Sequence, residues 1–198
     1  MLAVGGVMLA VDAVMGGQVD NAFCAVRPPG HHAERNRAMG FCFFNNVAIG
    51  AVYALEKYGL KRVAIIDWDV HHGNGTEHLF EEDPRVFFVS LHGDPRYCSP
   101  GTGYRQEEGK GAGKGFTLNL PLPIRSGDSE YLEVLRSEAL PRLRQFAAQH
   151  YQGVRFHRPA VHHQNLLWKK ESRQSQKKCG YGQSNRAPAK NNNGIGAS

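Results

Sequence analysis

Residues 62–72, RVAIIDWDVHH, place acids and histidines directly after a run of strand-forming apolar side chains. A nearly continuous apolar run is typical of a parallel β-strand that is covered on both faces. Charged and imidazole groups at the end of a buried strand are costly unless they are paired, hydrogen-bonded or bound to a metal. This stretch therefore predicts both an α/β fold and a polar site at one edge of its sheet.

Helical and strand patterns alternate over the first 150 residues. The segments with helical character are 2–15, 45–58, 76–80 and 130–149. The segments with strand character are 23–26, 62–67, 86–91 and 116–120. This alternation predicts an α/β domain in which an open parallel sheet is flanked by helices on both faces. Ligands of such sheets bind at the carboxyl ends of the strands.

Periodicity also predicts which apolar side chains face the core. The helical positions expected to point inward are Val47, Ala51, Val52, Leu55, Leu132, Leu135, Leu140 and Leu143. Taken alone, the aromatic residues Phe41, Phe43 and Phe44 are expected in the core rather than in a site. Gly59 is expected to end the helix before it.

Residues 151–198 differ in composition from the rest of the chain. They hold nine Lys and Arg residues and one acid, whereas residues 1–150 hold fifteen Lys and Arg residues and seventeen acids. The segment ends in an asparagine, glycine and serine run, which predicts a disordered C-terminal tail outside the fold of residues 1–150. A basic tail can contact phosphates, but no base-reading motif accompanies it, so we expect no nucleic-acid partner.

The cysteines and the N-terminus indicate the compartment. Four cysteines are scattered without a CxxC pair, which argues against a disulfide framework and a thiolate zinc site. The apolar residues 1–17 follow no basic segment and are interrupted by Asp12, so they predict a buried helix rather than a signal peptide. No stretch is long enough to span a bilayer. We therefore expect a cytoplasmic protein without a membrane partner, and a homo-oligomer stays open.

Asp69 and His71 follow the predicted strand at 62–67 and could share a metal ion. They are two residues apart, so in an extended segment they face the same side. A carboxylate oxygen and an imidazole nitrogen are good ligands for zinc or a similar divalent ion. Two protein ligands are too few for a catalytic zinc site, so at least one more is required.

His31 and His32 form a second cluster on a glycine-containing loop. Adjacent side chains are expected to point apart, which suits one imidazole as a general base and its neighbour as an electrostatic partner. A carboxylate behind an imidazole fixes its tautomer, and Asp67 is well placed for that part. A lone His–Asp pair is usually structural, and Asn74 could simply serve a turn with Gly75. Two such clusters, each after a strand, favour a site.

Four motifs of the chain occur in a fixed order: RPPGHHA, GFCFFNN, DWDVHHGNGTEHLF and SLHGDPRYCSPGTGY. They resemble the successive motifs of the zinc-dependent histone deacetylase and acetylpolyamine amidohydrolase family, over about residues 1–146. The resemblance implies an arginase-like open parallel sheet and the hydrolysis of acetyl-lysine or acetylpolyamine amides. Residues 92–96, HGDPR, resemble the acetylpolyamine-type members more than nuclear histone deacetylases.

The resemblance implies a role for each residue of the two clusters. Asp69 and His71 match two of the three zinc ligands. His32 matches the general base that takes a proton from the metal-bound water, and His31 matches its electrostatic partner. Asp67 matches the carboxylate behind His31. The implied reaction is therefore metal-assisted amide hydrolysis with acetylated lysine or polyamine as substrate.

Further positions are implied around these clusters. Asn74 stands where the partner of His32 is Asp in some members and Asn in others. Gly40 and Phe41 match the floor and wall of the acyl-lysine tunnel. Oxygens around Asp67, Asp69, His71, Ser90 and Leu91 match a structural potassium site. A second potassium site fits more loosely at Phe80, Asp83, Val86 and Phe116.

Three parts of the family pattern have no counterpart in this sequence. The third zinc ligand is an Asp in a SAGFDAH-like strand, expected after the helix that ends near Gln149, and the oxyanion donor is a tyrosine in a Gly-Gly-Tyr motif. The strand that precedes Met1 in relatives is also absent. The sequence is therefore interpreted as a family member truncated at both ends or frame-shifted.

Three hypotheses for function follow. The first is a deacetylase-type amidohydrolase, and the second is a catalytically impaired remnant that at most binds metal or ligand. The third is a ureohydrolase-like enzyme with two metal ions, which Asn74 disfavours because a second metal would want a carboxylate there. Metal content per chain separates the three.

Overall fold

The computed structural model describes residues 1–148. Its helices and strands are α1 (Leu2–Met15), α2 (Asn46–Tyr58), β1 (Val63–Asp67), α3 (Asn74–Phe80), β2 (Val86–Gly93), η1 (Gly111–Gly113), β3 (Thr117–Leu122), α4 (Asp128–Val134), the π-helical η2 (Leu135–Ala139) and α5 (Leu140–Ala148). The three strands are parallel, in the order β1-β2-β3. The predicted α/β class with a parallel sheet is confirmed. The predicted tail, 151–198, lies outside the described residues.

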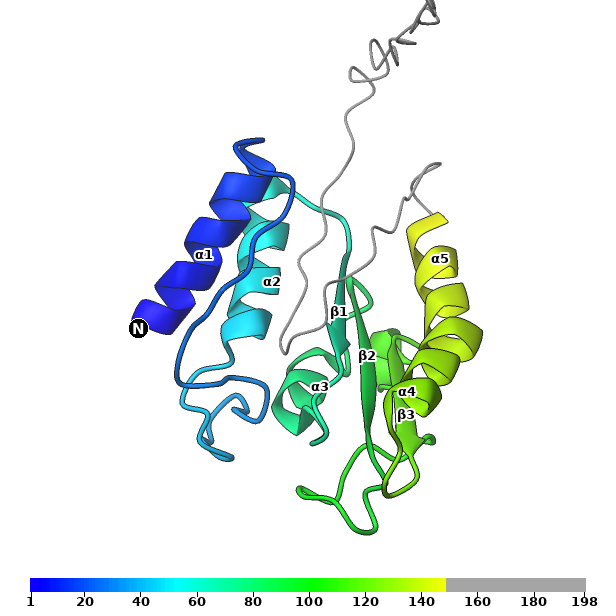
Figure 1. Ribbon diagram of the computed structural model, residues 1–198. Helices are drawn as coiled ribbons and strands as arrows, with labels where there is room; N and C mark the ends of the chain where they lie inside the picture. The colour runs from blue at the N-terminus through cyan, green and yellow to red at the C-terminus, as the bar shows by residue number, and fades with distance from the viewer. Residues whose placement is uncertain (149–198) are drawn as a thin grey trace, which may run out of the picture.

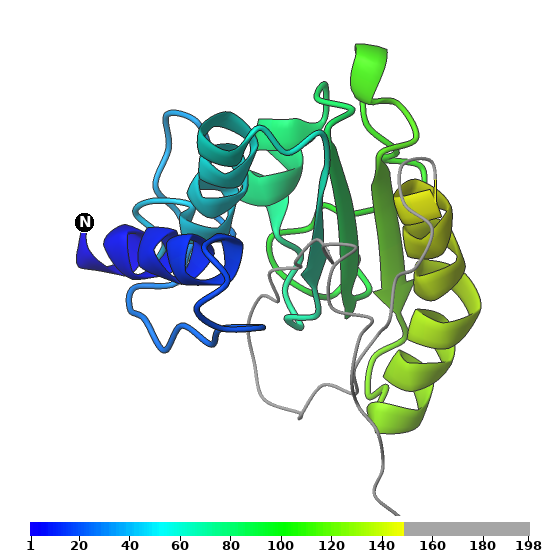
Figure 2. The same cartoon turned by 90° about the horizontal axis from the view of Figure 1, so that it is seen from above.

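Helices cover both faces of this sheet (Figures 1 and 2). α2 and α3 lie on one face, with α1 packed outside α2, and the helical segment from α4 to α5 lies on the other. The α2 side is filled by Val47, Ala48, Ala51, Leu55, Ile65, Phe80, Val86 and Phe88. The α5 side is filled by Phe87, Val89, Leu91, Leu120, Leu122, Ala139, Leu143 and Phe146. Successive side chains of β2 therefore point alternately into the two cores, as expected for a strand that is covered on both faces.

Local signals explain the bounds of α2. The Asn45 side chain accepts a hydrogen bond from the Ala48 N–H over 3.1 Å, which caps the N-terminus. Gly59 ends the helix in the left-handed conformation, with φ 62°. Val52 was expected to face the core but is 41% exposed. It lies one residue beyond Ala51, about 100° around the helix, and therefore turns away from the sheet.

The strand predicted at residues 23–26 does not form, because no other strand runs beside this segment within residues 1–148. It instead packs against α1, where the Cys24 thiol lies 3.8 Å from the Gly6 carbonyl oxygen. The helix predicted at 130–149 forms from Asp128 to Ala148 with a π-helical turn in its middle. That turn adds a residue and breaks the phase of the apolar positions, so Leu132 is 44% exposed while Leu143 is buried.

None of the helices formed by residues 1–148 combines the length and the apolar composition that crossing a bilayer requires.

Candidate active site

The polar side chains that the sequence singles out meet at the carboxyl ends of β1 and β2. Here the loop after β1 packs against the loop between α1 and α2. The Thr76 N–H donates to the His31 carbonyl oxygen over 3.1 Å, and Asn45 Nδ2 donates to Thr76 Oγ1 over 3.0 Å. These bonds tie the start of α3 to the histidine loop. Segments far apart in the chain therefore form one site.

His31 is held by the carboxylate that ends β1. Its Nδ1 lies 2.8 Å from Asp67 Oδ2, while Asp67 Oδ1 accepts from the Asp69 N–H over 3.1 Å. A Cβ at Gly73 would lie 2.5 Å from Asp67 Oδ2, so this close passage requires glycine. Burial opposes protonation of His31, but the hydrogen bond and charge of Asp67 outweigh it and raise the pKa of His31.

His32 is held by an amide instead. Its Nδ1 lies 2.8 Å from Asn74 Oδ1, and its Nε2 has no hydrogen-bond partner within residues 1–148. Burial lowers the pKa of His32, and the neighbouring charge of His31 lowers it further. The environments of the two histidines therefore push their pKa values in opposite directions.

The expectation that the adjacent histidines point apart is wrong. Their ring centroids lie 4.0 Å apart at an interplanar angle of 39°. Both rings turn the same way because each is bound by a side chain of the 67–74 segment, Asp67 for His31 and Asn74 for His32. The loop therefore presents the two imidazoles as a contacting pair.

Asp69 and His71 lie together at the mouth of the site. Asp69 Oδ1 accepts from the His71 N–H over 2.9 Å and lies 3.2 Å from His71 Nδ1. The side chains are 33% and 50% exposed, and the His71 ring lies 6.1 Å from that of His32 between centroids. Within residues 1–148, no third His, Cys, Asp or Glu joins them in a group that could hold a metal ion.

The loop that follows the two histidines carries exposed aromatic rings. Phe41, Phe43 and Phe44 are 90%, 68% and 48% exposed, so their predicted place in the core is wrong. Gly40 and Phe41 have φ angles of 55° and 63°, which turn the chain outward. A left-handed conformation is uncommon and strained for a bulky residue such as phenylalanine. This loop therefore holds Phe41 in solvent beside the histidine pair.

A buried polar layer behind the site was not anticipated from the sequence. His92 Nε2 lies 2.9 Å from the Gly103 carbonyl oxygen, and His92 Nδ1 lies 2.8 Å from Ser90 Oγ. Burial, with the charge of His72, lowers the pKa of His92 to about 4. The carbonyl can only accept, so Nε2 carries the proton, and Nδ1 must accept from the Ser90 hydroxyl. The polar alternation of Ser90 and His92 in an apolar strand was the available signal.

His72 extends this layer toward α3. Its Nδ1 lies 2.8 Å from Thr102 Oγ1, and its Nε2 lies 3.1 Å from Glu77 Oε2. Asn119 Nδ2 also donates to Glu77, over 2.6 Å. Burial opposes ionisation of Glu77, but these two partners outweigh it and lower the pKa of the carboxyl. The His72 pair therefore anchors the 102–107 loop to α3.

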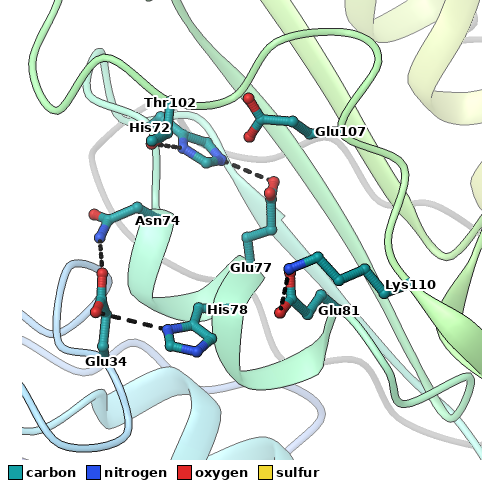
Figure 3. A pocket seen from close by; sticks show the side chains of 9 residues that line it. All are labelled: Glu34, His72, Asn74, Glu77, His78, Glu81, Thr102, Glu107 and Lys110. Carbon is teal, nitrogen blue, oxygen red and sulfur yellow. Dashed lines mark hydrogen bonds and ion pairs between the residues drawn. The ribbon is translucent and has the colours of Figure 1, made fainter.

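A hollow of about 280 Å³ opens between α3 and that loop (Figure 3). It is lined by Glu34, His72, Asn74, Glu77, His78, Glu81, Thr102, Glu107 and Lys110. Asn74 lies on its wall and holds His32 through its other side. The hollow therefore lies on the other side of Asn74 from the His32 ring.

Known proteins share this fold and these motifs. Residues 1–152 match the family model described as the histone deacetylase domain. The chain is 46% identical over 149 residues to a probable deacetylase of Archaeoglobus fulgidus, covering 75% of this chain and 41% of that protein. It is 42% identical over 148 residues to a histone deacetylase-like amidohydrolase of Pseudomonas aeruginosa, covering 75% and 39%.

A solved structure agrees with these matches. The acetylpolyamine aminohydrolase of Burkholderia pseudomallei superimposes with a TM-score of 0.69 at 40% identity, covering 73% of this chain and 42% of that one. The chain thus spans about two fifths of the length of these relatives. Sequence, fold and the ordered motifs agree over most of the chain, and the protein belongs to the histone deacetylase family.

Proposed function

We propose that this chain carries the histidine half of an amidohydrolase site that removes acetyl groups from acetyl-lysine or acetylpolyamine amines. One observation carries the proposal: two contacting histidines have separate partners that push their pKa values apart. Paired groups with opposite shifts are the usual arrangement for acid–base catalysis at neutral pH. The names of the relatives point to the same substrates.

Asp69 and His71 are the right kinds of ligand for zinc, but they are fewer than a catalytic zinc site needs. A carboxylate oxygen and an imidazole nitrogen are both zinc donors, and these two are adjacent and partly exposed. A catalytic zinc site takes three protein ligands, and residues 1–148 supply no third one. Zinc bound there would supply Lewis-acid polarisation of the acetyl carbonyl and acidify water.

His32 is the proposed general base. Its Nδ1 is occupied by Asn74, so the proton of the attacking water goes to Nε2, on the free side of the ring. Burial lowers the pKa of His32 and so favours the neutral form that can accept this proton. His31 acts as the electrostatic partner, and Asp67 fixes its ring and favours its charged form. The donor that would stabilise the oxyanion is not among these residues.

Gly40 and Phe41 are proposed to contact the substrate. The exposed ring of Phe41 offers an apolar surface for the methylene chain of a lysine or polyamine side arm. Gly40 brings the backbone against the His32 ring, where a Cβ would lie 2.7 Å from Cγ. The acyl group would then lie over the histidine pair.

A structural potassium ion is proposed at Asp67, Ser90 and Leu91. Asp67 and Ser90 are register partners on β1 and β2, and all three residues are buried. The Ser90 hydroxyl donates a hydrogen bond to His92 Nδ1, which leaves the lone pairs of Oγ available to a cation. Oxygen ligands of this kind suit a hard cation.

A catalytically impaired member is the second candidate, and the absence of a third metal donor within residues 1–148 favours it. The experiment that separates the two measures zinc per chain and hydroxamate-sensitive hydrolysis of a fluorogenic acetyl-lysine substrate on the full chain. Zinc near one per chain, with turnover lost in His32→Ala, supports the active enzyme. The impaired member is supported if the zinc content is well below one per chain, falls further in Asp69→Ala, and no turnover is detected. Asp128→Ala, an exposed acid on α4, is the matched control and should change neither reading.

A further inference from the structure

We infer that Glu34 is a positioning residue that sets the tautomer of His32 by holding the Asn74 amide in a single orientation. The inference rests on the proposed function only in taking His32 as the general base, and it adds a residue that the family resemblance does not assign. Glu34 makes no hydrogen bond to the ring of His31 or His32. It acts through Asn74 (Figure 3).

Asn74 is buried, and the three polar contacts of its amide fix both ends of that group. Its Oδ1 lies 2.8 Å from His32 Nδ1. Its Nδ2 donates to Glu34 Oε1 over 2.9 Å and to Met39 Sδ over 3.4 Å. Oxygen therefore faces the imidazole, and nitrogen faces the carboxylate and the thioether.

An asparagine alone would not select a tautomer of histidine. Its amide presents an acceptor on one side and a donor on the other, and it can bind either form of a neutral imidazole by flipping. An ionised carboxylate, by contrast, only accepts hydrogen bonds. The Glu34 carboxylate can therefore bond only to the Nδ2 group of Asn74, and Oδ1 of Asn74 must then face His32.

The tautomer of His32 follows from that orientation. Because Oδ1 of Asn74 only accepts, His32 Nδ1 must carry the proton, and the lone pair then resides on Nε2. The flipped amide would place Oδ1 against the Glu34 carboxylate and Nδ2 against His32 Nδ1. It would leave two acceptors facing each other and move the imidazole proton to Nε2, which could then accept no proton.

The carboxylate is itself held in place. Glu34 Oε2 lies 3.6 Å from His78 Nδ1 on α3, and the Glu34 side chain is 20% exposed. The Glu34 N–H donates to the Arg37 carbonyl oxygen over 2.9 Å, which closes the loop around it. Glu34 therefore approaches Asn74 from a prearranged position rather than as a free surface side chain.

Nitrogen-15 NMR of the full chain, labelled at histidine, tests the inference without substrate. Long-range proton–nitrogen correlations at about pH 8, above the usual imidazole pKa, distinguish the two neutral tautomers. The His32 signals are assigned by their loss in His32→Gln. We expect the Nδ1-protonated form to predominate in the unmodified chain. In Glu34→Leu, which cannot accept a hydrogen bond, we expect it to fall to about half or less.

Two further variants make the test specific. Glu34→Gln retains an acceptor but can also flip, so we expect a fraction between those of the unmodified chain and Glu34→Leu. The double variant Glu34→Gln with Asn74→Asp moves the acceptor-only group next to His32, and it should restore the Nδ1-protonated form. Glu81→Gln is the matched control. The Glu81 carboxylate lines the same hollow but pairs with Lys110 and not with Asn74, so its removal should leave the tautomer of His32 unchanged.

Two results would overturn the inference: an Nε2-protonated His32 in the unmodified chain, or an unchanged tautomer in a folded Glu34→Leu variant. If Glu34→Leu fails to fold, Glu34→Gln decides, since an Nδ1-protonated fraction equal to that of the unmodified chain would contradict the inference. Failure of the proposed function is distinguishable, because it would abolish hydrolysis while leaving the tautomer ranking of these variants intact.

Discussion

Gly40→Ala should damage both stability and the site, and the structure allows the two contributions to be separated. Gly40 has a φ angle of 55°, where an L side chain costs about 1–2 kcal/mol. The added Cβ would also overlap the His32 ring, lying against Cδ2 and 2.7 Å from Cγ. Real Cβ atoms do not approach other heavy atoms this closely. A movement of the ring away from this Cβ would strain its hydrogen bond to Asn74.

The overlap adds a cost typical of overpacking, about 1–3 kcal/mol. We therefore expect Gly40→Ala to lower the free energy of unfolding by about 2–5 kcal/mol in urea titrations followed by circular dichroism. Gly59→Ala is the matched control, because Gly59 has a φ of 62° and nothing within 4 Å of its Cβ position. It should lose only the backbone part, about 1–2 kcal/mol.

The same pair of variants reports on the site. Gly40→Ala should shift the His32 signals in a histidine NMR spectrum, whereas Gly59→Ala should leave them in place. Equal losses of stability in the two variants, with unshifted His32 signals in both, would refute the steric argument. The loop would then be able to move away from the ring at no cost.

Three more predictions concern the rest of the molecule. Asp67→Asn should lower the pKa of His31, which NMR titration measures. The raised pKa of His31 stabilises the folded state below about pH 6.5, and this stabilisation is lost as the pH rises through the folded-state pKa. The loss of unfolding free energy in the variant should therefore be larger near pH 6 than near pH 9. Phe87→Ala should cost about 3–5 kcal/mol in urea unfolding, since its ring is buried between β2 and α5, and a loss below about 1 kcal/mol would contradict that packing. Removing residues 151–198 should leave the helical circular dichroism signal nearly unchanged, because that segment is poor in apolar residues, and a large loss would mean that it joins the core.

Local patterns predicted the elements well where the signal lies within a few residues. The Asn45 cap and the Gly59 stop bound α2 within one residue of the expected 45–58. The apolar run before Asp67 identified β1 because both faces of that strand are buried against helices. The prediction of a strand at residues 23–26 was wrong because a β-strand requires a neighbouring strand, and the local sequence of a segment does not show whether one lies beside it.

The site was predictable in composition and less so in geometry. The carboxylate behind His31 was expected from the position of Asp67 at a strand end. The ring contact between His31 and His32 was not, since it depends on bonds to residues 36 and 42 positions away. The exposure of Phe41 did not follow from its side chain alone, because an aromatic residue taken by itself predicts burial; Phe41 lies in solvent on a left-handed backbone.

The contact between the two histidine rings has a consequence for how the site titrates. Two imidazoles with centroids 4.0 Å apart repel each other strongly when both are protonated, so the first proton to bind disfavours the second. The pair then behaves as one unit with two macroscopic ionisations, and each belongs to both rings. Between those two steps the pair carries one positive charge, which Asp67 favours on His31. A substitution at either ring should therefore displace both limbs of a pH profile.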